Sequence, residues 1–212
     1  MKRTRLLLAD DHTLVVEGIR KLLENDFELV GTVEDGQALL RAAQELHPDV
    51  IVLDISMPVL NGIETCRQLV KLMPGSRVIF LTMHADVAYV EEALRAGGAG
   101  YLLKRSAASE LVDAIHTVMR GERYVTPLIN WKEPVKSSRP RRKGGAITRL
   151  TQRQREVLQL VAEGRANKEI AALLHVTEKT VDFHKACIKR ELMLNSTAEL
   201  TQFAIKHRII GI

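Results

Sequence analysis

The stretch Asp49-Val-Ile-Val-Leu-Asp54 decides which fold the sequence predicts for its first half. Four consecutive apolar residues are typical of a short strand buried on both faces, as in a parallel sheet covered by helices. Similar runs recur, separated by segments in which apolar residues have helical spacing. We expect strands at 5–9, 28–33, 50–53, 78–81 and 100–103, and helices at 12–25, 37–46, 62–72, 87–94 and 109–120. This alternation predicts an α/β fold, a doubly wound five-stranded parallel sheet with helices on both faces.

The second half of the chain differs from the first in composition and in charge. Residues 1–124 carry 14 Lys and Arg against 18 Asp and Glu, whereas residues 125–212 carry 17 against 8. The segment EPVKSSRPRRKGG (133–145) has almost nothing to bury, which predicts a flexible basic linker over 125–147. Residues 148–212 show only helical spacing, which predicts a small all-α helix-turn-helix domain. The positive charge favours a polyanionic partner, and a merely solvated basic surface is the alternative.

The composition limits the compartment in which we expect the protein. No stretch approaches eighteen consecutive apolar residues, so no transmembrane helix is predicted. The basic N-terminus is followed by an apolar run that ends at two acids, which is too short for a signal peptide. Two cysteines that lie far apart are typical of a reducing compartment. We therefore expect a cytoplasmic protein that does not associate with membranes.

Polar side chains follow four of the five expected strands. Asp10 and Asp11 follow the first, Asp54 the third, Thr82 the fourth and Lys104 the fifth. If these strands are neighbours, all of these side chains meet at the carboxyl edge of the sheet. Clustered carboxylates favour a hard cation such as Mg²⁺, and a cation with a lysine neutralises a phosphoryl group that a carboxylate nucleophile accepts. Each residue alone is more often a cap or a turn residue, and only the combination favours such chemistry.

The segment Thr177–Leu192 is the expected recognition helix, because the second helix of a helix-turn-helix enters the major groove of DNA. Val181, His184, Ile188 and Leu192 form one stripe and are expected to pack inward. Lysines on the opposite face are suited to phosphate contacts, and base choice depends on groove-edge contacts. A small helical bundle with a solvated basic face is the alternative. The candidate DNA-contacting residues are Lys168, Thr177, Lys179, Thr180, Asp182, Phe183, Lys185, Ala186, Lys189 and Arg190.

The first half resembles the receiver domains of two-component response regulators, which have a flavodoxin-like fold. The matching strings are ADDH (9–12), DVIVLDISMPVLNGIE (49–64), VIFLTMH (78–84) and GYLLKR (100–105). The resemblance implies that Asp54 accepts a phosphoryl group from a sensor histidine kinase. It implies that Asp11, Asp54 and the carbonyl of Ser56 hold Mg²⁺, with Asp10 assisting, often through water. It also implies that Thr82 and Lys104 hold phosphoryl oxygens and that Tyr101 is a switch aromatic that moves inward as Thr82 is drawn to the phosphate.

The second half resembles the LuxR/NarL type of helix-turn-helix over 150–192, with REVL, NKEIA and EKTV as the clearest matches. Gln152 stands where proline is usual, and His175 and Met193 stand where glycine is common. Asp182 occupies a position often filled by lysine. An acid there repels phosphate but accepts a hydrogen bond from cytosine, and Phe183 and Ala186 are suited to thymine methyl groups. In this family the last helix, expected at 196–207, pairs two DNA-binding domains, and closing its own bundle is the alternative.

These observations favour a response regulator of the NarL/FixJ family, a transcriptional regulator that phosphorylation of Asp54 switches. Double-stranded DNA, a sensor kinase and a second copy of the chain are the expected partners. We do not expect an enzyme, apart from slow hydrolysis of its own aspartyl phosphate. A constitutive DNA-binding or protein-interaction regulator with a silent receiver remains open, as does an aspartyl-phosphate enzyme.

Overall fold

We describe a computed structural model of the chain over residues 3–132, 149–207 and 209–210. The chain divides into two compact units, 1–133 and 134–212, and each is described by itself. Within the described residues, no helix is both long and apolar enough to cross a membrane.

The first unit is built on one parallel sheet with the strand order β2-β1-β3-β4-β5-β6. The strands that the apolar runs predicted are all present, and the central ones are fully buried, as expected for a sheet covered on both faces. The strands are β1 (Arg5–Ala9), β2 (Glu28–Val33), β3 (Val50–Leu53), β4 (Arg77–Thr82), β5 (Gly100–Leu103) and β6 (Tyr124–Val125).

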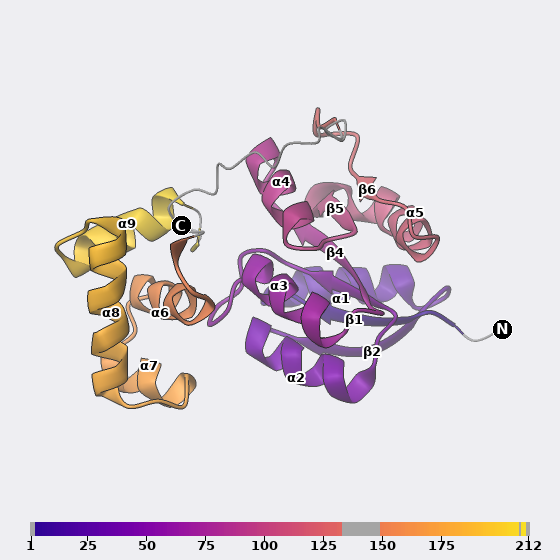
Figure 1. Cartoon of the computed structure of the whole chain (residues 1–212). Coiled ribbons are helices and arrows are strands. Elements are labelled where there is room, and N and C mark those ends of the chain that lie inside the picture. Colours follow the sequence, from indigo (N-terminus) through magenta and orange to yellow (C-terminus); the bar gives the residue numbers. More distant parts are fainter. Residues whose placement is uncertain (1–2, 133–148, 208, 211–212) are drawn as a thin grey trace. The chain divides into compact units, whose positions relative to one another are not determined.

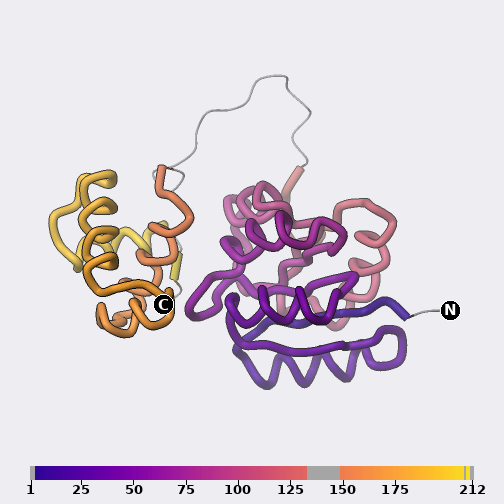
Figure 2. The backbone as a smooth tube through the Cα atoms, turned by 60° about the horizontal axis from the view of Figure 1, so that its bottom comes forward, coloured from indigo at the N-terminus to yellow at the C-terminus, as the bar shows by residue number. Residues whose placement is uncertain are grey.

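Helices cover both faces of this sheet, and two apolar clusters form its core (Figure 1). One cluster joins α2, α3 and α4 to the sheet, and the other joins α1 and α5 to the opposite face. Figure 2 lets the reader follow the alternation along the backbone. Side chains of Asp35, Asn61 and Asp86 cap three of the helices. The helices are α1 (Thr13–Leu23), α2 (Gly36–Leu46), α3 (Gly62–Leu72), α4 (Val87–Arg95) and α5 (Ala107–Met119), with a short 3₁₀ turn η1 (Lys104–Ser106) before α5.

The sixth strand, β6, corrects the expectation of a five-stranded sheet. Its two residues pair in parallel with Gly100 and Tyr101 of β5, at the outer edge of the sheet. Beyond it, Ile129 is buried and Trp131 packs against the cluster formed with α2, α3 and α4. The chain therefore remains packed on the sheet through the first residues of the segment expected to be a linker. A run of two residues shows no periodicity, so the sequence gives no sign of it. The rest of that expected linker, 133–147, lies outside the described residues.

The second unit contains four helices among its described residues. The side chains of Thr151, Thr177 and Ser196 cap their helices, whereas Asn167 is the first residue of its helix and Ala166 stands at the cap position. Leu200 and Ala204 of the last helix are fully buried, so they close the bundle. His175 and Met193, which stand where glycine is common, adopt positive φ angles of 52° and 55°. The helices are α6 (Gln152–Ala162), α7 (Asn167–Leu173), α8 (Glu178–Leu192) and α9 (Thr197–Lys206).

Candidate acidic site and candidate nucleic-acid interface

The strand order places β1, β3, β4 and β5 side by side, so the polar residues at their carboxyl ends share one edge of the sheet. Lys104 Nζ lies 2.8 Å from Asp54 Oδ2 and 2.9 Å from Asp10 Oδ2. Both carboxylates are almost completely buried, and Thr82 is buried at the end of the neighbouring strand. The structure thus brings together residues that are up to 94 positions apart in the chain.

Lys104 is the cation that stabilises this cluster in the structure. Burial of its ammonium lowers the pKa of Lys104, but hydrogen bonds to Asp54 and Asp10 and the charges of both carboxylates outweigh that effect. The net result is a pKa above the ordinary value for lysine. Lys104 therefore stays charged at neutral pH and is positioned to meet a further anion at the same place.

The donor atoms at this edge fit a divalent cation. One ligand atom from each of Asp10, Asp11, His12 and Asp54 lies within 4.8 Å of the others. Asp54 Oδ1 is buried and has no hydrogen-bond partner among the residues that the structure describes. Carboxylate oxygens are the ligands that Mg²⁺ prefers, and an unpartnered buried oxygen is costly unless something binds it. The residues present therefore suit a hard cation such as Mg²⁺.

Gly62, the first residue of α3, explains how the chain passes so close to Asp54. A Cβ atom at Gly62 would lie 2.0 Å from the backbone oxygen of Asp54. Only glycine allows this approach, and Gly62 N–H donates to the carbonyl of Ile55 at 2.9 Å. The glycine thus helps to hold the loop that follows Asp54.

His84 connects several of the expected site residues, a role that its position in the sequence did not predict. Its Nε2 lies 2.9 Å from the hydroxyl of Ser56, and its backbone N–H donates to the hydroxyl of Thr82 at 3.3 Å. Its carbonyl accepts from the hydroxyl of Tyr101 at 2.8 Å, and its ring stacks on Tyr89. Tyr101 is fully buried, so the expected switch aromatic lies in its inward position. The sequence offered only the placement of His84 two residues beyond Thr82.

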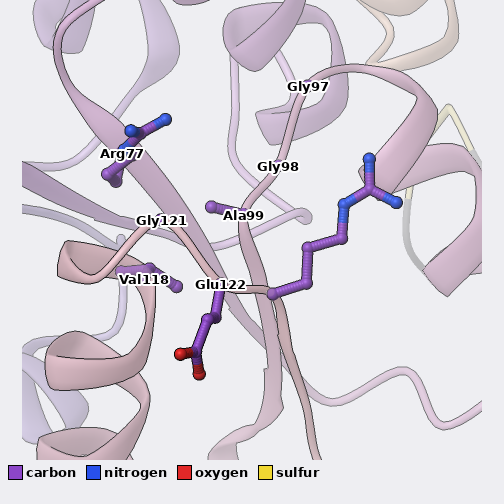
Figure 3. A pocket seen from close by; sticks show the side chains of 8 residues that line it. Arg77, Gly97, Gly98, Ala99, Val118, Gly121 and Glu122 are labelled. Atoms are coloured by element: carbon purple, nitrogen blue, oxygen red, sulfur yellow. The ribbon is translucent and has the colours of Figure 1, made fainter.

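An open pocket of about 180 Å³ lies at the opposite edge of the sheet, away from the acidic site (Figure 3). It is formed where β4, β5 and β6 begin, and Arg77 and Glu122 extend beside a backbone rich in glycine. None of the expected site residues lines it. Its lining residues are Arg77, Gly97, Gly98, Ala99, Val118, Gly121, Glu122 and Arg123.

In the second unit, α8 has the two faces that the sequence predicts. Val181 and Ile188 are fully buried, while His184 and Leu192 of the same stripe are half-buried. The candidate DNA-contacting residues lie on the accessible surface. Half-buried among them are Thr180, Lys185 and Lys189, and exposed are Lys168, Thr177, Lys179, Asp182, Phe183, Ala186 and Arg190.

A hydrogen-bonded chain of three side chains ties α7 to α8. Asn167 Nδ2 donates to Asp182 Oδ1 at 2.6 Å, and Lys185 Nζ donates to Asn167 Oδ1 at 3.0 Å. An asparagine at the start of a helix is typical of a cap, but the side chain of Asn167 makes these contacts. Glu169 accepts from the backbone N–H of Ala166 instead. One carboxylate oxygen of Asp182 is therefore bound to Asn167.

Comparisons with known proteins identify both units. Residues 6–116 match the model of the response regulator receiver domain, and residues 148–204 match that of bacterial regulatory proteins of the luxR family. The chain is 34% identical over 214 residues to the oxygen regulatory protein NreC of Staphylococcus carnosus, covering 97% of this chain and 99% of that protein. It is 33% identical over 222 residues to the transcriptional regulatory protein DegU of Brevibacillus brevis, covering 97% and 94%.

Solved structures of RcsB are similar over nearly the whole chain. One is a structure of RcsB from Salmonella typhimurium that concerns conformational dynamism for DNA interaction. It is 29% identical, with a TM-score of 0.57, and the match covers 96% of this chain and 98% of that chain. Another, of two RcsB dimers bound to two parallel DNAs, has a TM-score of 0.57 and 27% identity, covering 95% and 98%.

Proposed function

This chain belongs to the response regulators that join a receiver domain to a LuxR-type helix-turn-helix domain, and we propose that phosphorylation of Asp54 controls how its second unit binds DNA. Such proteins are DNA-binding transcriptional regulators switched by phosphorylation, and not enzymes. One observation carries the assignment to Asp54. Its carboxylate is buried with Oδ2 held by Lys104, while Oδ1 has no partner among the described residues.

Phosphoryl transfer at this site uses the oxygen of Asp54 that Lys104 does not hold. Asp54 Oδ1 attacks the phosphorus of a phosphohistidine on a sensor histidine kinase, the P–N bond breaks, and the donor imidazole takes a proton. Lys104 and the Thr82 hydroxyl then hold phosphoryl oxygens. Asp10, Asp11, Asp54 and the carbonyl of Ser56 would hold Mg²⁺, which would supply positive charge to neutralise the phosphoryl group. The acyl phosphate hydrolyses slowly without help from an enzyme.

The contacts of His84 suggest how the switch responds. The Thr82 hydroxyl now accepts from the backbone of His84, whose carbonyl in turn holds the hydroxyl of Tyr101. A phosphoryl group that draws the Thr82 hydroxyl to itself removes the first of these bonds. We expect the loop that carries His84 to shift, which changes the surface beside Tyr101.

Incubation of the full chain with acetyl phosphate and Mg²⁺, followed by intact mass, tests the acceptor. We expect one added phosphoryl group, its absence in Asp54→Asn, and its loss over time in buffer. Because Asn has nearly the size of Asp but no nucleophilic oxygen anion, Asp54→Asn is a matched control. Equal labelling of Asp54→Asn would show that another residue is the acceptor, and no labelling of the wild type would favour a silent receiver. Turnover of many phosphates per chain would favour an aspartyl-phosphate enzyme.

The exposed face of α8 is the proposed DNA-reading surface. Lys179 and Arg190 are suited to phosphates, while Phe183 and Ala186 are suited to thymine methyl groups in the major groove. Asp182 keeps one oxygen beyond its bond to Asn167, with which it accepts from cytosine N4. Because RcsB is described as dimers on DNA, we propose that this chain also binds DNA as a homodimer at paired half-sites.

Selection of random DNA sites by the full chain, with and without acetyl phosphate, tests the output. We expect paired half-sites, and tighter binding after phosphorylation that is lost in Asp54→Asn. Phosphate-dependent binding that persists in Asp54→Asn contradicts the proposed switch. Identical binding in both states favours the constitutive regulator.

A further inference from the structure

The side-chain amide of Asn167, on α7, lies between two oppositely charged side chains of α8. Asn167 is half-buried, its Nδ2 donates to Asp182 Oδ1 at 2.6 Å, and its Oδ1 accepts from Lys185 Nζ at 3.0 Å. Asp182 and Lys185 are candidate DNA-contacting residues, whereas Asn167 is not one of them. Both ends of one neutral amide are therefore engaged with groups that we expect to face DNA.

The spacing of the two charged residues makes this arrangement informative. Asp182 and Lys185 lie three positions apart on α8, a separation at which an acid and a base on one helix face are neighbours and attract each other. Among the described residues, no ion pair joins their charged groups, and each is bound to the Asn167 amide instead. A direct pair would occupy an oxygen of the acid with the lysine. The amide therefore stands where it keeps the two charges apart.

We propose that Asn167 is a positioning residue for base reading, which keeps Lys185 from pairing with Asp182 and leaves one Asp182 oxygen to accept from cytosine N4. The proposal rests on the proposed DNA-reading surface and gives α7 a part in its base preference. Cytosine N4 is a donor in the major groove, and a carboxylate is a suitable acceptor for it. Without the amide, Lys185 turns to Asp182 and competes with the base for that acceptor.

These contacts predict an effect on base preference and little effect on stability. The bond between Asn167 and Asp182 lies at the surface, where water competes with it. Once α8 enters a groove, water is displaced, and an acid that lacks partners beside phosphates becomes costly. The Asn167 N–H then still donates to one oxygen of Asp182, and the base donates to the other.

Competition binding of the full chain to selected DNA sites that differ at one base pair tests the proposal. Asp182→Ala first identifies the base pair whose preference depends on the carboxylate. At that base pair, we expect Asn167→Ala to lower the preference for cytosine about fivefold. The double variant should lower it no further than Asp182→Ala alone. Asn167→Asp keeps an acceptor for Lys185 but has no donor for Asp182, so it should lower the preference as much as Asn167→Ala.

Asn195→Ala is the matched control, because Asn195 is the other asparagine of the second unit and is exposed beyond the end of α8. It should keep the wild-type preference at the base pair that Asp182→Ala identifies. Urea unfolding followed by circular dichroism should show Asn167→Ala to be at least as stable as the wild type, because alanine favours a helix. A loss of preference in Asn167→Ala is then not a loss of folded protein.

The outcomes separate this inference from the proposed function. If Asp182→Ala changes a base preference that Asn167→Ala or Asn167→Asp retains, the amide does not position the acid, and only the inference fails. Independent, additive effects of Asn167→Ala and Asp182→Ala also overturn it, as does an Asp182→Ala variant with every preference of the wild type. If the wild type selects no DNA site, the proposed function fails and the inference fails with it. If the selected sites do not depend on phosphate, the proposed switch fails, while the expected pattern of losses still establishes the role of Asn167.

Discussion

Gly62→Ala measures how far the site depends on the close passage of α3 beside Asp54. The added Cβ would lie 2.0 Å from the Asp54 carbonyl oxygen and 3.0 Å from Ile55 Cα, whereas ordinary contacts begin near 3.4 Å. The neighbouring backbone must therefore move by more than 1 Å, because no flexible side chain is available to yield. Overpacking of this kind costs about 3 kcal/mol.

Urea denaturation followed by tryptophan fluorescence measures this loss of stability as a shift of the unfolding midpoint. Trp131 is the only tryptophan in the chain and packs against a core cluster of the first unit, so its emission reports on that unit. With a slope of about 1.5 kcal/mol per molar urea, about 3 kcal/mol lowers the midpoint by about 2 M. Phosphate uptake from acetyl phosphate should also slow, because the backbone that carries Asp54 is displaced.

Gly18→Ala is the matched control within the same unit. A Cβ at Gly18, inside α1, meets nothing within 4 Å, so alanine should stabilise the helix by about 0.5–1 kcal/mol. The reasoning is refuted if Gly62→Ala keeps the wild-type midpoint, or if both variants shift in the same direction by similar amounts.

Lys104, Cys66 and Asp182 each offer a further test of the structure. Lys104→Met leaves two buried carboxylates without their ammonium and should lower the free energy of unfolding by about 3 kcal/mol in urea titrations. Because folding raises the pKa of Lys104, the stabilisation by Lys104 is fully present below about pH 10.4 and is lost as the pH rises through the folded-state pKa. If the difference in free energy of unfolding between the wild type and Lys104→Met grows above about pH 10.4, the assignment is contradicted. Burial raises the pKa of the Cys66 thiol to about 12. A thiol reagent at pH 8 should therefore label only Cys187 in the folded chain and both cysteines in urea, whereas rapid labelling of Cys66 in the folded chain refutes its burial. Asp182→Ala removes the acceptor that Asn167 orients and should change the preferred base more than the overall affinity in competition binding, whereas equal losses on all site variants count against base reading.

The ends of the strands were readable from the sequence because each depends on nearby residues. The apolar run before Asp54 fixes β3, and the alternation of strands and helices then places Asp10 and Lys104 at the same edge. The direct contact of Lys104 with both acids confirms that this simple topology rule was enough to bring them together.

The features that the sequence did not predict depend on contacts across elements. β6 has two residues and forms because the backbone N–H groups of Tyr124 and Thr126 bond to Ala99, just before β5, and to Tyr101 on β5. No pattern of its own predicts it. The side chain of Asn167 bonds to Asp182, fifteen residues further along the chain on α8, although asparagine at the start of a helical segment is typical of a cap. The motif ADDH contains His12 but assigns it no role, because only the folded chain brings its ring close to the acids.

Strand β6 also sets where the chain can be divided for experiments. The backbone N–H groups of Tyr124 and Thr126 donate to the carbonyls of Ala99 and Tyr101, at 3.0 and 2.9 Å. A fragment that ends before Tyr124 leaves the β5 edge open and removes the apolar cover supplied by Ile129. Open edges with unpaired backbone groups recruit strands from other molecules. Such a fragment should self-associate in a way that the intact protein does not, and aggregation of that kind is easily mistaken for signalling-dependent dimerisation.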